Sequence, residues 1–276
     1  MLKALASKYE TKEFLVGDPS WFMHQIEGDV NKELLAFIAS ALSYGSRRQF
    51  LPKIQLLLDS INSDATGDVP RWLTEGIYNK VVPQTDACFY RLYTCQTFNT
   101  FLTALAQMVS EYGSMREFLK VHINGHHDTA SQGRAQCSDA NKKSLLAEGR
   151  LMTCVEAIGL LTQWFRDHGS AGVVPKDTTS SCKRVCMFLR WMVRDGSPVD
   201  LGLWVDIIDK RTLIIPMDTH VVQEAMRLGL LRSKSTSMSN AIRLTSRLAE
   251  IFPDDPTKGD FALFGMGVDE EVKNEE

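Results

Sequence analysis

The segment Ile214-Ile215-Pro216-Met217-Asp218-Thr219-His220-Val221-Val222 continues into Glu224-Ala225-Met226-Arg227-Leu228-Gly229-Leu230, and it guides the interpretation of the whole chain. An apolar approach ends at Pro216, and an Asp-Thr pair then opens a stretch with helical spacing of apolar residues. Asp218 can cap this helix, because a side-chain oxygen at that position accepts a backbone N–H that has no partner in the first turn. We therefore expect a helix directly after Asp218.

Outside this segment the sequence pattern predicts helices along almost the whole chain. Apolar residues recur at helical spacing, and no run alternates with a period of two. The expected helices cover residues 1–9, a start at 18–21, 29–44, 46–61, 69–78, 86–95, 97–110, 114–122, 142–167, 182–194, 198–210, 219–230 and 237–251. Loops are expected at 62–68 and 169–181, and 122–141 is rich enough in Gly, Ser, His and Asp to predict a flexible loop or insertion.

Composition places the chain among soluble globular proteins. It has 276 residues, with 44% apolar and 24% charged residues, so it can form one large unit or two lobes that share a cleft. No apolar run is long enough for a membrane span, and charged residues follow the first Met too soon for a signal peptide. We therefore expect a cytoplasmic protein without membrane association. The six cysteines include no CxxC pair and should be reduced thiols.

Charge is distributed unevenly along the chain. Residues 176–247 carry twelve Lys/Arg against seven Asp/Glu, whereas residues 248–276 carry two against nine. The basic segment beside Asp218 suits a phosphate backbone, although a balance of +5 over this length can also arise by chance. The acidic tail, residues 268–276, is expected to be a solvated, frayed terminus.

Lys183 is the second residue with a chemical signal. It stands in Ser180-Ser181-Cys182-Lys183-Arg184, where either serine can cap the helix that follows, so Lys183 falls in the first helical turn. The helix dipole there disfavours a cation, and burial would disfavour it further. Both effects favour the neutral amine, the form that an amine nucleophile requires. The alternatives are an ordinary surface lysine at position 183 and a plain helix cap at Asp218.

Together these two residues resemble the arrangement in helix-hairpin-helix DNA glycosylases of the endonuclease III type. In that superfamily a Lys begins the helix after the hairpin, and a Val-Asp-Thr-His-Val segment begins a later one. The helix at 261–267, after Asp260, resembles the closing helix of the superfamily. The whole chain also resembles an uncharacterised bacterial family marked by Ser-x-x-Lys-Arg, Phe-Leu-Arg-Trp-Met-Val-Arg, Val-Asp-x-Gly-x-Trp and Pro-x-Asp-Thr-His-Val. All four patterns are present, and they end at Arg184, Arg194, Trp204 and Val221.

The resemblance implies an all-α, two-lobed glycosylase-like fold. One lobe would comprise approximately 1–30 and 210–276, the other approximately 31–209. It also implies a base-excision enzyme acting on duplex DNA, with Lys183 as nucleophile, Asp218 as the carboxylate and possible lyase activity. No cofactor is expected, because no cysteine follows Cys186 to form the iron–sulfur loop of endonuclease III.

Two departures separate the chain from endonuclease III. The place of the hairpin Leu-Pro-Gly-x-Gly reads Gly172-Val173-Val174-Pro175-Lys176-Asp177-Thr178-Thr179, where Lys176 and the two threonine hydroxyls would have to replace the phosphate-binding amides. Lys183 and Asp218 are 35 positions apart, about twice the endonuclease III separation. An archaeal branch that removes 8-oxoguanine shares the wide spacing and an altered hairpin. By that analogy the favoured lesion is an oxidised purine such as 8-oxoguanine.

Further side chains are candidates for substrate or DNA contact. They are Tyr44, Arg47, Arg48, Lys176, Arg184, Trp191, Trp204 and His220. The first three form a helix–helix turn that could stack on bases or contact phosphate, or could simply be solvated. Walls for an extruded base could come from Phe188, Trp191, Trp204, Phe261 or Phe264, and the sequence does not show which of them lines a pocket. His220 could instead be an ordinary helix-face residue, and Cys182 and Cys186 are expected to be core thiols.

No metal site is expected; His126-His127-Asp128 is a weak alternative, because adjacent residues rarely form a closed site. Two other functions remain open at this point. One is a non-catalytic nucleic-acid-binding module that keeps the fold, and the other is a helical protein-interaction protein. The sequence does not set the oligomeric state.

Overall fold

A computed structural model describes residues 1–125 and 150–275 of the chain. The described part is predominantly helical, so the all-α class is confirmed. The α-helices are α1 (Leu2–Tyr9), α2 (Asp29–Leu42), α3 (Arg47–Ala65), α4 (Val69–Thr74), α5 (Cys95–Tyr112), α6 (Met115–Gly125), α7 (Cys154–Asp167), α8 (Lys183–Val193), α9 (Thr219–Arg227), α10 (Met238–Ala249) and α11 (Gly259–Glu275). Short 3-10 helices are η1 (Lys12–Leu15), η2 (Pro19–His24), η3 (Ile77–Lys80), η4 (Lys210–Thr212) and η5 (Pro256–Lys258).

A small antiparallel hairpin interrupts the helices. Strands β1 (Cys88–Tyr90) and β2 (Tyr93–Thr94) pair with Tyr90 opposite Tyr93. The helix expected at 86–95 is therefore wrong. Aromatic residues favour a pleated strand, and Arg91 adopts a left-handed backbone conformation (φ 50°) that a helix does not allow.

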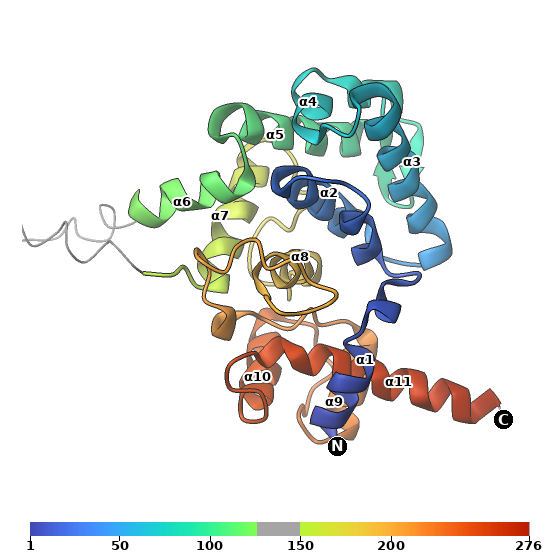
Figure 1. The fold of residues 1–276 in the computed structure, drawn as a ribbon, viewed down its shortest axis with the longest axis vertical. Coiled ribbons are helices and arrows are strands. Elements are labelled where there is room, and N and C mark those ends of the chain that lie inside the picture. Colours follow the sequence, from blue (N-terminus) through green and yellow to red (C-terminus); the bar gives the residue numbers. More distant parts are fainter. Residues whose placement is uncertain (126–149, 276) are drawn as a thin grey trace, which may run out of the picture.

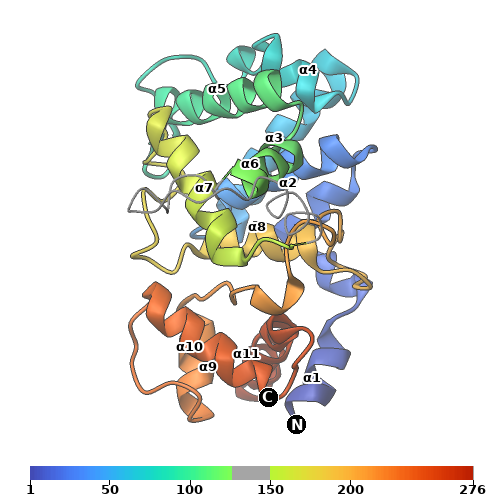
Figure 2. The ribbon, with the colours of Figure 1, turned by 90° about the vertical axis from the view of Figure 1, so that its left-hand side faces the viewer.

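Helices α2 and α8 lie at the centre of the molecule (Figure 1). Ten of the fourteen residues of α2 are buried, which explains why its sequence is apolar nearly all round. Phe37 of α2 meets Phe188 of α8 at a ring-centroid distance of 4.9 Å. Figure 2 shows α1, α9, α10 and α11 at one end of the molecule, α3, α4 and α5 at the other, and α8 between them.

The first helix of the chain, α1, packs on the last, α11. Gly265 allows this close approach, because a Cβ at that position would lie 2.0 Å from the ring of Tyr9. Phe14 then places its ring edge on Phe261 and Phe264 of α11. The N-terminal segment is thereby held against the C-terminal helices.

Several expected element boundaries need correction. Helix α3 continues to Ala65, into the expected loop at 62–68, and residues 122–125 belong to α6 and not to a loop. The short helix expected at 198–210 is absent; η4 begins only at Lys210. Helix α11 continues to Glu275, so the expected frayed tail is helical over 268–275. The remainder of the predicted loop, 126–141, and the predicted helical residues 142–149 lie outside the described residues.

Candidate active site

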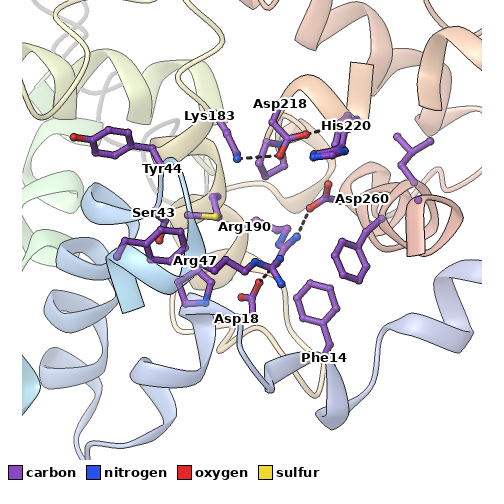
Figure 3. A pocket seen from close by; sticks show the side chains of 18 of the residues that line it. Phe14, Asp18, Ser43, Tyr44, Arg47, Lys183, Arg190, Asp218, His220 and Asp260 are labelled. Atoms are coloured by element: carbon purple, nitrogen blue, oxygen red, sulfur yellow. Dashed lines mark hydrogen bonds and ion pairs between the residues drawn. The ribbon is translucent and has the colours of Figure 1, made fainter. Parts of the chain in front are cut away.

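Two helix starts, far apart in the sequence, place Lys183 beside Asp218. Lys183 is the first residue of α8, and Asp218 is the N-cap of α9, where its Oδ1 accepts the backbone N–H of Val221 at 2.9 Å. The Nζ of Lys183 donates to Oδ2 of Asp218 at 3.0 Å (Figure 3). Each side chain is about a third exposed, 35% for Lys183 and 33% for Asp218. One carboxylate therefore caps a helix with one oxygen and pairs with an amine through the other.

The start of α8 differs from the expected serine cap. Cys182 is the N-cap, with a left-handed backbone (φ 47°) and no side-chain cap bond. Ser181 instead connects the start of α8 with two other helix starts: its N–H donates to the carbonyl of Thr236, just before α10, and its hydroxyl donates to the carbonyl of Met217, just before α9, at 3.5 Å. The bond to Met217 helps to hold residue 183 against residue 218.

The pair lines a cavity of about 490 Å³, shown from close by in Figure 3. Its lining comes from the N-terminal segment, the α2–α3 turn, α8, the start of α9 and α11. The residues are Phe14, Asp18, Pro19, Ser43, Tyr44, Gly45, Arg47, Phe50, Lys183, Met187, Arg190, Pro216, Asp218, His220, Val221, Asp260, Leu263, Phe264 and Gly267. The cavity combines aromatic walls with three carboxyl groups and three basic side chains, Arg47, Lys183 and Arg190, and its volume falls in the range of small-molecule sites.

Asp218 is held in its ionised form. Burial acts to raise its pKa, but the charge of Lys183, the N–H of Val221 and the charge of His220 together outweigh burial, so the net pKa is lowered. The ionised carboxylate accepts a hydrogen bond from the amine at 3.0 Å, so it is placed to receive a proton from Lys183, although its lowered pKa makes it a weak base.

A second ion pair lies deeper in the same cavity. Arg190 of α8 donates through Nη1 to Oδ2 of Asp260 in the first turn of α11 (Figure 3), and its Nε lies 3.4 Å from Oδ1 of Asp200. Burial raises the pKa of Asp260 to about 6, although Arg190 acts to lower it; the nearby charge of Asp218 adds to the rise. A carboxyl whose pKa lies near neutrality beside a lysine is a common feature of catalytic sites.

Sequence reasoning missed Asp260, Arg190 and Asp18 as members of the site. The signal for Arg190 was present: it is a charged residue within the otherwise apolar Phe188–Val193 run, and such a residue needs a buried partner. Asp18 was recognised only as part of a helix start, and it is indeed the N-cap of η2. Its second oxygen lies 3.6 Å from Arg47.

Three of the predicted contact residues line the cavity. Arg47 pairs with Asp18, and its guanidinium lies 5.9 Å from the ring centroid of Phe264. His220 is exposed and acts electrostatically on Asp218. Tyr44 is half-buried and packs edge-on against Tyr90 and Tyr93, so only part of its ring reaches the cavity.

Trp191 and Trp204, two of the aromatic candidates for substrate contact, do not form walls of this cavity. Both side chains are fully buried in the core and absent from the cavity lining. Trp204 packs against Phe188 and donates its indole N–H to Oε2 of Glu33 at 2.9 Å. Burying the large apolar area of these two rings stabilises the fold, and this favours their position in the core.

Three predicted DNA contacts lie outside the cavity. Arg184 is half-buried and donates through Nη1 to the carbonyl of Ala41 and the hydroxyl of Tyr93, so it anchors α8 to α2 and β2. Arg48 and Lys176 are exposed. Their role in binding phosphate stays a prediction.

Within residues 1–125 and 150–275 no group of three or more His, Cys, Asp or Glu side chains is placed to hold a metal ion. His126-His127-Asp128 lies outside the described residues. Cys182 and Cys186 are buried free thiols, as expected for core residues. A hydrogen bond with Cys154, together with burial, raises the pKa of Cys186, which keeps this thiol protonated and unreactive.

Comparison with known proteins gives a family but no activity. The model of a family described as "Protein of unknown function (DUF2400)" matches residues 18–269, and the chain belongs to this family. No curated protein and no solved structure matches the chain. Among the described residues no helix has the length and apolar character needed to cross a membrane.

Proposed function

We propose that this protein is a DNA base-excision glycosylase with associated lyase activity, in which Lys183 is the nucleophile and Asp218 the carboxylate that serves it. One observation carries the proposal: an amine and an ionised carboxylate, 35 positions apart, lie 3.0 Å apart at the edge of a cavity with aromatic walls. This matches what the resemblance to helix-hairpin-helix glycosylases implies for the same two residues.

The chemistry follows from the positions of the two groups. Asp218 takes a proton from the Lys183 ammonium, and the neutral amine attacks C1′ of the deoxyribose. The bond between C1′ and the base breaks, and the departing base takes the electron pair and then a proton. This proton is the one that Asp218 took from Lys183, so Asp218 regains its negative charge and stabilises the cation-like sugar. Opening of the sugar ring gives an iminium between Lys183 and C1′, and loss of a proton from C2′ with departure of the 3′-phosphate then cuts the strand.

The remaining cavity residues suit an extruded base. Phe14, Phe50 and Phe264 offer apolar surfaces on which a flat ring can lie. Arg47 also lines the cavity, and although it pairs with Asp18, half of its side chain (50%) is exposed and is available to a phosphate. The favoured lesion remains an oxidised purine, such as 8-oxoguanine, by analogy with the archaeal branch that shares the wide spacing.

Borohydride trapping tests the assignment directly. Purified protein is incubated with duplexes that carry 8-oxoguanine, uracil, thymine glycol or an abasic site. Borohydride reduces the iminium to a stable amine, so a covalent band is expected from wild type and none from Lys183→Gln. Lys210→Gln is the matched control, because Lys210 has a similar exposure (32%) and also pairs with a carboxylate, Asp195, but does not line the cavity.

Asp218→Asn separates catalysis from binding. Asparagine keeps the helix cap but removes the charge, so turnover should fall by about 10²-fold or more while duplex affinity changes little. A covalent band that persists in Lys183→Gln would refute the nucleophile. Absence of any band and of any released base with all four duplexes would refute the enzyme and leave Asp218 as a helix cap.

A further inference from the structure

The β1–β2 turn exposes an apolar side chain that the fold does not use. The turn consists of Arg91 and Leu92, and Leu92 is 86% exposed, more than any other large apolar side chain in the described residues. A single exposed leucine is unremarkable on a protein surface. Leu92 differs from such a residue in two ways: the hairpin that carries it is rigidly packed, and the neighbouring segments are rich in Lys and Arg.

The hairpin that carries Leu92 is firmly held. The ring of Phe89 stacks on Phe98 at 4.9 Å between centroids. Tyr90 donates its hydroxyl proton to the carbonyl of Tyr44, and Tyr44 donates in return to the carbonyl of Tyr90 at 3.3 Å. Leu92 is therefore presented on a fixed support, so little conformational entropy remains to be lost when it contacts a partner.

The turn stands next to the mouth of the cavity. Tyr44 and Gly45 line the cavity, and the guanidinium of Arg91 lies 5.8 Å from the ring centroid of Tyr44. A Cβ on Gly45 would approach Nη1 of Arg91 to 2.4 Å, so Arg91 covers the backbone of this cavity-lining turn. A duplex whose extruded base enters the cavity would thus bring its neighbouring base pairs over the hairpin turn.

The surroundings of Leu92 are basic. Segments 43–53 and 88–94, which form the α2–α3 turn with the first part of α3 and the hairpin, together contain four Lys/Arg and no Asp or Glu. Lys53 lies over the ring of Phe89, and Arg184 lies over Tyr44. An apolar tip inside a basic, aromatic surface is complementary to base pairs flanked by phosphates.

We propose that Leu92 is a wedge that enters the base stack of duplex DNA beside the cavity, with Arg91 contacting the adjacent phosphate. This inference rests on the proposed function, since it gives the site a way to open the duplex. Apolar side chains inserted between base steps unstack them and kink the helix, and an extruded nucleotide leaves a gap that such a side chain can fill.

The test uses Lys183→Gln protein, which keeps the whole chain but prevents covalent chemistry. Its partner is a short duplex with a tetrahydrofuran abasic analogue next to 2-aminopurine, whose fluorescence rises on unstacking. Binding is measured at low salt. Binding of the Lys183→Gln protein should increase the 2-aminopurine fluorescence. In the double variant Lys183→Gln/Leu92→Ala most of this increase should be lost, and the affinity for the duplex should fall about tenfold because the buried methyl groups are missing. Leu92→Phe should restore both signals.

Ile242→Ala, an exposed aliphatic residue on α10 outside the cavity lining, is the matched control and should behave as the parent. If Leu92→Ala leaves fluorescence and affinity unchanged while wild type still forms the trapped complex, the wedge is refuted and the glycosylase stands. If Leu92→Ala removes the signal but no variant is ever trapped, the wedge stands and the enzyme is refuted. Failure of the Lys183→Gln parent to bind the duplex at low salt, together with the absence of any trapped complex from wild type, would overturn both.

Discussion

Replacing Arg194 with methionine would leave three carboxylates in the interior without their common cation. Arg194 is only 2% exposed and joins four parts of the chain. Its Nε and Nη2 form a bidentate pair with Asp255 at 2.7–3.0 Å, Nη2 also reaches Glu10 at 2.6 Å, and Nη1 donates to Asp200. The substitution keeps an apolar stem of similar length, so it removes the charge and its hydrogen bonds while leaving most of the packing.

The expected loss is large compared with the stability of a typical protein. Removing one partner of a buried ion pair costs about 3–5 kcal/mol, because the other charge stays buried without compensation. Natural proteins are stable by only about 5–15 kcal/mol. R194M should therefore lose a large share of its free energy of unfolding at pH 7, as measured by urea denaturation. R247M is the control, because Arg247 pairs with Glu250 on the surface at 58% exposure and should lose less than about 1 kcal/mol.

The loss should depend on pH with a definite sign. Burial raises the pKa of Asp200, and Arg190 and Arg194 act to lower it, so removing Arg194 raises this pKa further. A raised pKa in the folded state means stability that is present below the unfolded pKa, about 4, and is lost as pH rises. The difference between wild type and R194M should therefore grow from pH 4 to pH 7. A loss at pH 7 no larger than that of R247M, or an equal loss at both pH values, would refute this account.

Three further predictions concern other contacts. Burial raises the pKa of Asp260 to about 6, so this carboxyl stabilises the folded state most below pH 4, and its stabilisation is lost as pH rises through 6. The free energy of unfolding in urea should lack this pH dependence in Asp260→Asn. The same pH dependence in the variant and the wild type would contradict the prediction. Trp204→Phe removes the indole N–H that bonds the buried carboxylate of Glu33 and should cost about 1–3 kcal/mol of unfolding free energy; a neutral effect would show that Glu33 finds another donor. Gly265→Ala should cost about 1–3 kcal/mol because the new methyl meets the Tyr9 ring, and adding Tyr9→Ala should recover part of the lost melting temperature; no recovery would locate the strain elsewhere.

The sequence predicted the features that depend only on a few consecutive residues, such as helix caps and amphipathic helices. The cap at Asp218 and the helix after it depend on atoms within three residues, and both are present as predicted. The same is true of Lys183 in the first turn of α8 and of most of the amphipathic helices. Helical periodicity reports which face of a segment is buried, so it predicted the all-α class without any knowledge of neighbours.

Contacts between residues far apart in the sequence decided the features that local sequence patterns could not predict. An apolar, aromatic run such as 86–95 is compatible with helix or hairpin, and its packing on Phe98 and Tyr44 selects the hairpin. Burial is non-directional, so sequence cannot tell whether Trp191 or Trp204 faces a cavity or the core. Asp218 and Lys183 each carry a signal of their own, but the 3.0 Å between them arises from bonds such as Ser181 to Met217, which no local pattern contains. The residue types of the site follow from the sequence, and their distances follow from how distant helices pack.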